Sequence, residues 1–156
     1  MKKVLFVCLG NICRSPMAEV IFKDKVKNKG LFDVIEVSSR ATGSWNDGDA
    51  PHKGTQEKLK EVGLSYEGLH AQKISSDDFH QFDYIIGMDE NNIRDLEGLS
   101  PDIESLYKIH LLLSEEVGLD KKMIPDPYYT GDFDLTYELI NKGTTKWLEK
   151  IEQEMS

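Results

Sequence analysis

The sequence predicts a single α/β domain over residues 1–156, built on a parallel four-stranded sheet with helices on both faces. Two short apolar runs, at residues 4–8 and 82–88, are typical of strands that are buried on both faces. Segments with helical periodicity alternate with the expected strands, as they do in parallel sheets with right-handed crossovers. No linker, repeat or low-complexity tract divides the chain, and 156 residues suit one domain.

The first helix is expected directly after the first strand. Ser15 and Pro16 predict its N-cap and its first helical residue, and Gly30 predicts its end. A second strand is expected over residues 34–39, where apolar and polar side chains alternate. A loop rich in Gly, Asn and Asp follows over residues 40–51.

The second half of the chain continues the alternation. We expect a helix over 53–62, a helix capped by Asp89, a strand over 103–109 and a final helix with apolar spacing from 133 to 151, while 111–117 has helical character. The arrangement is flavodoxin-like or Rossmann-like. In such folds ligands bind beyond the carboxyl ends of the strands, and the first strand-to-helix turn is a favoured place.

The composition excludes several classes of protein. A net charge of −9 argues against a general nucleic-acid binder, which needs a basic face. Two cysteines are too few for a disulfide framework or a four-ligand zinc site, and we expect neither a metal nor a cofactor. The apolar run at residues 4–10 is too short and too soon interrupted for a secretory signal, and no stretch is long enough to span a membrane. We therefore expect a soluble, cytoplasmic, monomeric protein without a membrane partner.

Residues 8–15 join a thiol, a tight turn and an arginine at the start of a helix. Gly10 allows a positive φ in this turn. Free backbone N–H groups, the positive end of the helix dipole and the guanidinium of Arg14 all favour an anion. The sequence thus predicts a phosphate-binding loop between the first strand and the first helix. The same field stabilises a thiolate, so Cys8 is expected to be a nucleophile at neutral pH.

This loop resembles the signature of the low-molecular-weight protein tyrosine phosphatases, and reads VCLGNICRSP at residues 7–16. The resemblance continues in order through SRAT at 39–42, Trp45, FDY at 82–84, MDE at 88–90 and DPYY at 126–129. It implies hydrolysis of protein phosphotyrosine and small aryl phosphates, without a metal or cofactor. The implied partners are a phosphotyrosine-containing protein as substrate and inorganic phosphate as product.

The resemblance also implies a role for each residue of the site. Cys8 would form a phosphocysteine, Arg14 would hold the phosphate, and Asp126 would serve as general acid and then as base. Ser39 and Asp89 would support the loop. The implied substrate-binding residues are Leu9, Gly10, Asn11, Ile12, Cys13, Ser15, Trp45, Tyr128 and Tyr129.

For three residues the sequence leaves alternative interpretations. Asp126 lies between two prolines, which predicts a stiff loop in which the carboxylate does not cap a helix, and the plain alternative is an Asp-Pro turn. Cys13 is either a reversible disulfide partner of Cys8, as in some family members, or a small packing residue. His70 departs from the His-x-Ala-Arg pattern common in the family, so it is better interpreted as a surface histidine.

Arsenate reductase and protein-arginine phosphatase are the alternative functions within the same fold. Thioredoxin-linked arsenate reductases need cysteines beyond the loop, which the chain lacks. Protein-arginine phosphatases of the family carry Thr in the place of Ile12 and lack the paired tyrosines that follow Asp126 here. A non-catalytic phosphate-binding or redox-sensing module is the alternative from another class, but it would have no use for Asp126.

Overall fold

The computed structural model describes all 156 residues and contains one parallel sheet with the strand order β2-β1-β3-β4. β1 lies in the interior of the sheet and pairs with both β2 and β3. The strands are β1 Lys2–Cys8, β2 Ile35–Ala41, β3 Tyr84–Gly87 and β4 Ile109–Leu111. The expected parallel four-stranded sheet is therefore confirmed.

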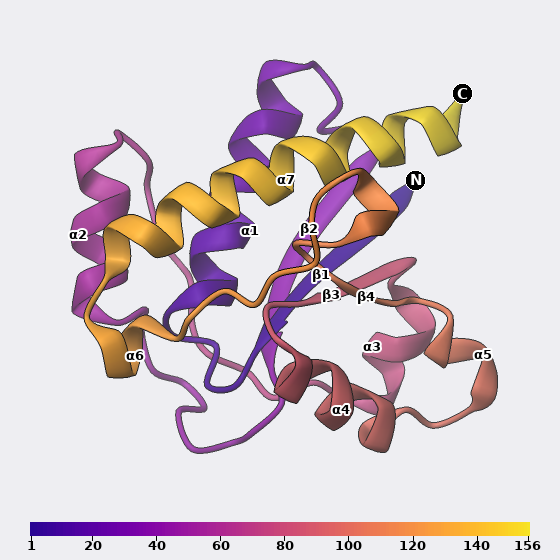
Figure 1. Ribbon diagram of the computed structural model, residues 1–156, viewed down its shortest axis with the longest axis horizontal. Helices are drawn as coiled ribbons and strands as arrows, with labels where there is room; N and C mark the ends of the chain where they lie inside the picture. Colours follow the sequence, from indigo (N-terminus) through magenta and orange to yellow (C-terminus); the bar gives the residue numbers. More distant parts are fainter.

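Helices cover both faces of this sheet (Figure 1). α1 packs against β1 and β2 and along the long helix α7, whereas α4 contacts β3 and β4 from the other side. The helices are α1 Arg14–Asn28, α2 Lys53–Glu61, α3 Ser76–Gln81, α4 Glu90–Leu99, α5 Ile103–Leu106, α6 Pro127–Thr130 and α7 Phe133–Met155, with a 3-10 turn, η1, at Glu115–Val117. None of them combines the length and the apolar character that a membrane span requires.

The two faces of β1 feed two separate apolar clusters. Val4 and Phe6 belong to the larger cluster beneath α1 and α7, and Leu5 and Val7 belong to the smaller one beneath α3 and α4. Because successive side chains of a strand point to opposite faces, a strand covered on both sides is apolar throughout. This double burial fixes the carboxyl end of β1, where Cys8 lies, against both layers.

Two of the expected elements are corrected by the structure. The strand predicted over residues 103–109 is wrong, because Asp102 accepts a hydrogen bond from the backbone of Ser105 and starts helix α5 there. The fourth strand is instead Ile109–Leu111, and the helical character expected over 111–117 reduces to the 3-10 turn η1.

The predicted start of the first helix is also wrong. α1 begins at Arg14 and its N-cap position is Cys13, so Ser15 and Pro16 lie inside the first turn. The hydroxyl of Ser15 is engaged by Asn11 and Cys8 and does not cap the helix. The predicted end holds, because Gly30 follows the C-cap with a left-handed φ of 69°.

Candidate active site

A cavity of about 390 Å³ opens where β1 runs into α1. Its floor is the loop between these elements, and its sides come from the loop after β2 and from α6. The lining residues are Cys8, Leu9, Gly10, Ile12, Cys13, Trp45, Asn46, Asp126, Tyr128 and Tyr129. Asn46 is the one that sequence reasoning missed, since nothing in the pattern distinguishes it from the other polar residues of its loop.

The backbone of the floor is open to an anion. None of the backbone N–H groups of residues 10–13 donates to another atom of the protein. Such free donors at the start of a helix, together with the helix dipole, form an anion-binding arrangement. The predicted cradle for a phosphate therefore has the donors that it needs.

The turn in this loop is made by Asn11 and not by Gly10. Asn11 has a φ of 57°, in the left-handed region, whereas the positive φ that Gly10 would allow is absent. Asn tolerates this conformation better than most residues because its side chain can hydrogen-bond locally. At Gly10 a Cβ would lie 2.8 Å from Oδ1 of Asn46, so that side chain would have to shift.

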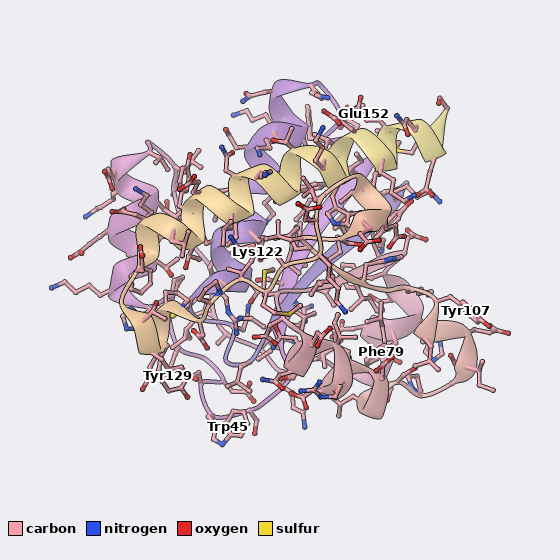
Figure 2. The ribbon with its side chains drawn as sticks, in the orientation of Figure 1. Trp45, Phe79, Tyr107, Lys122, Tyr129 and Glu152 are labelled. Atoms are coloured by element: carbon pink, nitrogen blue, oxygen red, sulfur yellow. The ribbon has the colours of Figure 1, made fainter.

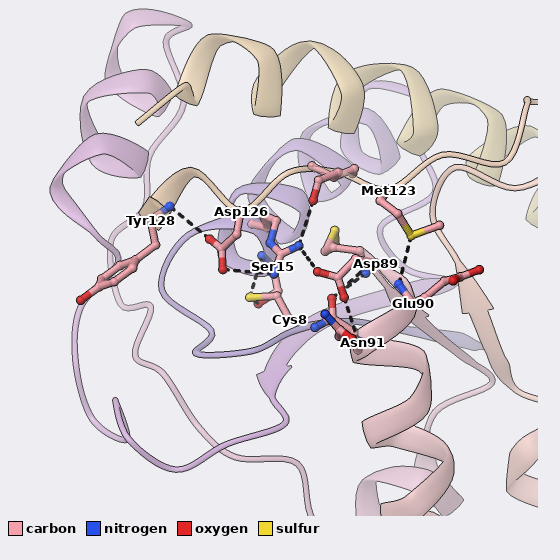
Figure 3. A network of polar contacts seen from close by, with 12 residues as sticks. Cys8, Ser15, Asp89, Glu90, Asn91, Met123, Asp126 and Tyr128 are labelled. Atoms are coloured by element: carbon pink, nitrogen blue, oxygen red, sulfur yellow. Dashed lines mark hydrogen bonds and ion pairs between the residues drawn. The ribbon is translucent and has the colours of Figure 1, made fainter. Parts of the chain in front are cut away.

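Cys8 lies at the bottom of the cavity with donors close to its sulfur. Its Sγ accepts from the backbone N–H of Ser15 at 3.4 Å and lies 3.0 Å from the hydroxyl oxygen of Ser15 (Figure 3). Both groups belong to the first turn of α1, so the positive end of that helix faces the sulfur. The arrangement favours a negative charge on Cys8.

Arg14 connects three segments that are distant in the sequence, although only 1% of it is exposed. Its Nη1 donates to Asp89 at 2.6 Å and to the carbonyl of Ile124 at 2.9 Å, and its Nη2 donates to Asp126 at 3.3 Å. Burial alone would lower the pKa of Arg14, but Cys8 and the two carboxylates outweigh it and raise the pKa. Nε is buried and makes no hydrogen bond within the protein, which leaves it for a ligand oxygen.

Asp126 is the N-cap of the short helix α6, which corrects the expectation that it caps nothing. Its Oδ1 accepts from the backbone N–H of Tyr128 at 3.1 Å, while Oδ2 faces Arg14. The expectation failed because Pro127 occupies the first helical position, where the missing N–H costs nothing and the fixed φ starts a helix. The cap holds the carboxylate at the wall of the cavity.

Three exposed aromatic side chains stand around the mouth of the cavity. Trp45 is 76% exposed and Tyr129 is 75% exposed, and both project from the same lower edge of the molecule in Figure 2. Tyr128 meets Tyr129 edge-on, with ring centroids 5.1 Å apart. His52 lies 6.0 Å from the ring of Tyr128 and stacks on Phe133 from behind. These aromatic side chains come from the loop after β2 and from α6.

A hydrogen-bonded network lies beneath the floor. Nδ2 of Asn11 donates to the hydroxyls of Ser15 at 2.7 Å and Ser39 at 3.0 Å, and its Oδ1 accepts from the backbone of Gln72 at 3.1 Å. Ser39 in turn donates to the buried Glu19. Asn11 and Ser15 therefore do not line the cavity with their side chains. Sequence reasoning missed Glu19 because a charged side chain on a helix normally indicates a face that is exposed to solvent.

Cys13 and His70 are the two other residues for which the sequence leaves alternatives. Burial is the main cause that raises the pKa of the Cys13 thiol, to about 12, and the nearby Cys8 and Asp126 act in the same direction. Cys13 and Cys8 are both free thiols. His70 is exposed and its ring faces the carbonyl of Gly68 at 3.2 Å, as its interpretation as a surface histidine predicts.

The chain is similar in sequence and in structure to known proteins. Residues 3–156 match the model of a family described as low molecular weight phosphotyrosine protein phosphatase. The chain is 45% identical to the low molecular weight protein-tyrosine-phosphatase YfkJ of Bacillus subtilis, over 99% of this chain and 98% of that protein. The crystal structure of YfkJ superposes with a TM-score of 0.95 at 44% identity, over 100% and 98% of the two chains.

Two further solved structures bear on the substrate. The low molecular weight protein tyrosine phosphatase SP-PTP of Streptococcus pyogenes has a TM-score of 0.84 at 44% identity, covering 96% of this chain and 93% of that one. A Drosophila protein described as an arginine phosphatase has the same TM-score at 36% identity, covering 97% and 98%. Proteins that share this fold are therefore described as a tyrosine phosphatase in one case and as an arginine phosphatase in the other.

Proposed function

Because the chain belongs to the low molecular weight phosphotyrosine protein phosphatase family, we propose that it hydrolyses phosphotyrosine in proteins, and small aryl phosphates, through a phosphocysteine. The observation that carries this proposal is that Cys8 and Asp126 line one cavity, while Arg14 forms an ion pair with Asp126 and interacts electrostatically with Cys8. A nucleophile, a cation for the phosphate and a proton donor are the three parts that such a reaction needs.

In the first step the thiolate of Cys8 attacks phosphorus, and the bond from phosphorus to the tyrosyl oxygen breaks. Asp126, in its protonated form, gives its proton to that oxygen, so the product leaves as a neutral phenol. The three remaining phosphoryl oxygens lie against Arg14 and the free N–H groups of residues 10–13, where charge builds up in the transition state.

In the second step water attacks the phosphocysteine. Asp126 accepts a proton from that water, the bond between sulfur and phosphorus breaks, and Cys8 leaves as a thiolate. Ser15 donates to the departing sulfur through its backbone N–H and lies within hydrogen-bonding distance through its hydroxyl. The products are inorganic phosphate and the free enzyme.

Two carboxylates contact Arg14, and their surroundings assign them different roles. Asp89 lies 2.6 Å from the guanidinium and also caps α4 in a reciprocal arrangement with Asn92, so it is held as a structural partner. Asp126 lies farther from the guanidinium, at 3.3 Å, and lines the cavity. Asp126 is therefore the carboxyl group placed to reach a leaving group, and Asp89 the one that orients Arg14.

The rim favours a flat, long side chain as the substrate. Trp45, Tyr128 and Tyr129 raise aromatic walls above Cys8, and an aryl phosphate would stack between them while its phosphorus reaches the sulfur. A phosphoserine, whose phosphate lies close to the peptide backbone, would stop at the rim. Phosphoarginine is the second candidate, since one structural neighbour is described as an arginine phosphatase. Ile12 and the paired tyrosines favour phosphotyrosine.

The proposal is tested with three peptides of one sequence that carry phosphotyrosine, phosphoserine or phosphoarginine, assayed with a chelator present. We expect the phosphotyrosine peptide to be hydrolysed fastest and the phosphoserine peptide not to be hydrolysed. Faster release from phosphoarginine would assign the arginine phosphatase activity instead. Binding of all three without any release would assign a binding module.

The proposal extends to the setting of the reaction. Residues 1–156 would act as one catalytic domain, as a monomer in the cytoplasm, with no metal or cofactor in any step. Size-exclusion chromatography with light scattering at the concentration used in the assay checks the monomer, and activity in a chelator checks the independence from metal.

A further inference from the structure

Glu19 is a charged residue that the proposed reaction does not use, yet only 4% of it is exposed. It lies on α1, one turn after Ser15. Its Oε1 accepts from the hydroxyl of Ser39 at 2.6 Å, and its Oε2 forms an ion pair with Lys23 at 2.5 Å. Burying a carboxylate is costly unless it is paired and hydrogen-bonded, so its position beneath the cavity calls for a function.

The hydrogens can be followed from Glu19 to Asn11. A carboxylate carries no hydrogen to donate, so the hydrogen of the Ser39 hydroxyl points to Glu19. The oxygen of Ser39 is then left as an acceptor, and it receives a hydrogen from Nδ2 of Asn11 at 3.0 Å. The acid thus fixes the hydrogen of Ser39 and leaves its oxygen as an acceptor for Asn11.

The second half of the chain runs from Asn11 to the sulfur. The backbone N–H of Gln72 donates to Oδ1 of Asn11, which fixes the amide so that its two hydrogens face Ser39 and Ser15. Because the oxygen of Ser15 accepts from Asn11, its own hydrogen is free to donate. Its acceptors are Sγ of Cys8 at 3.0 Å and the carbonyl of Arg40 at 3.4 Å, and the sulfur is the nearer.

We propose that Glu19 is a positioning residue: it keeps the Ser39 hydroxyl as an acceptor for Asn11 and so, together with the backbone N–H of Gln72, holds Asn11 and through it the Ser15 hydroxyl that donates to the sulfur of Cys8. No proton moves along the chain, and every hydrogen stays on its own atom. Without an acceptor at position 19 the Ser39 hydroxyl can turn its hydrogen toward Asn11, donor against donor. The inference rests on the proposed function, in which Cys8 is first the nucleophile and then the leaving group.

The other groups that act on the sulfur lie outside this chain. Arg14 from α1, Cys13 from the loop and Asp126 from the start of α6 surround Cys8 in and beside the cavity. None of them contacts Glu19, Ser39 or Asn11 through a side-chain hydrogen bond. A change at Glu19 therefore reaches Cys8 through Ser15 and leaves these neighbours in place.

The test compares Glu19→Met, which removes the acceptor, with Glu19→Gln, which keeps an oxygen that Ser39 can donate to. Alkylation of Cys8 by iodoacetamide is followed across pH. We expect the midpoint of the Met variant to rise by about one pH unit, the value of one hydrogen bond to a charged group, and that of the Gln variant to stay near the parent. The rate of phosphocysteine hydrolysis, measured by rapid quench, should fall about tenfold for Met with kcat/KM little changed above the midpoint.

A matched control uses Glu152, which pairs with Lys29 on the outside of α7 and lies at the opposite edge of the molecule from Trp45 in Figure 2. Glu152→Met should move neither the alkylation midpoint nor the hydrolysis rate. Ser39→Ala breaks the same link from its other side by the loss of one atom, so it decides the matter if Glu19→Met does not fold. It should raise the midpoint as Glu19→Met does.

Three results would overturn the inference: an unchanged midpoint in folded Glu19→Met or Ser39→Ala, a Gln variant as impaired as the Met variant, or shifts that add in Glu19→Met/Ser39→Ala. If Glu19 acts through Ser39, the double variant should show no more than the single shift. Alkylation requires no phosphorylated substrate. A shifted midpoint in a chain that hydrolyses no phosphate would therefore refute the proposed function and leave this inference standing.

Discussion

The floor and the rim of the cavity are built in opposite ways. Cys8 on the floor and Arg14 and Ser15 next to it are buried, and each is held by hydrogen bonds. Trp45 and Tyr129 on the rim are mostly exposed and project from the loop after β2 and from the short helix α6. A rigid floor suits a transition state whose geometry does not vary, whereas a loosely held rim suits substrates that do. Changes on the floor should therefore act on kcat, and changes on the rim on KM.

The largest effect is expected at the nucleophile. Cys8→Ser should abolish release of phosphate from an aryl phosphate, because a serine hydroxyl in this site is neither ionised nor a comparable leaving group. Binding of inorganic phosphate, measured by calorimetry, should persist because Arg14 and the loop N–H groups remain. Residual turnover above background in the Cys8→Ser variant would refute the mechanism.

Asp126→Ala should be next. Loss of a general acid lowers kcat by about 10²- to 10⁴-fold, and less for a substrate with a good leaving group that needs no proton. The comparison is made between phenyl phosphate and p-nitrophenyl phosphate. Asp89→Asn is the informative partner, because Asp89 is assigned to Arg14 and not to the leaving group. An equal loss on both substrates in Asp126→Ala would contradict its role as acid.

The rim should give a smaller effect of a different kind. Trp45→Ala and Tyr128→Ala should each raise KM for a phosphotyrosine peptide about two- to tenfold with kcat nearly unchanged, which is the value of one aromatic contact. Gly43→Ala tests the contribution of Trp45 in a second way, since its Cβ would lie 1.6 Å from the indole of Trp45 and displace the ring. A drop in kcat without a change in KM would mean that floor and rim do not separate.

The smallest effect is expected at the second thiol. Since burial raises the pKa of Cys13 to about 12, its thiol is protonated at pH 7 and should not react with iodoacetamide there. Mass spectrometry of the native protein should find one label, on Cys8. Phosphate at saturating concentration should slow that labelling. A label on Cys13 of the folded Cys8→Ser variant would show that the floor is more open than the structure indicates.

Much of the fold can be predicted from the sequence because β1 and β3 are buried on both faces and are apolar almost throughout. The long helix α7 can be predicted equally well, since its apolar residues keep helical spacing. The fourth strand is not, because its three residues are only partly buried and the run before it is as apolar as a strand. There Asp102, a cap that acts over three residues, decides for a helix.

The site, too, has a part that can be predicted from the sequence and a part that cannot. Residues 8–15 are contiguous, so their chemistry can be read locally, and Asp126 is found only through the family resemblance. What joins Glu19 to Ser39, or Gly10 to Asn46, is contact between segments, which leaves no local pattern. The cap made by Asp126 was missed for another reason: two prolines suggested a stiff loop, but proline is also a residue that starts helices.

The guanidinium of Arg14 has a consequence for how the molecule unfolds. It binds the start of α4 through Asp89, on one side of the sheet, and Ile124, whose side chain belongs to the cluster on the other. Neither layer can open without breaking a contact of this side chain, so the two halves should melt as one cooperative unit. Catalytic activity and tertiary structure should then disappear at the same concentration of denaturant, with no inactive folded intermediate between them.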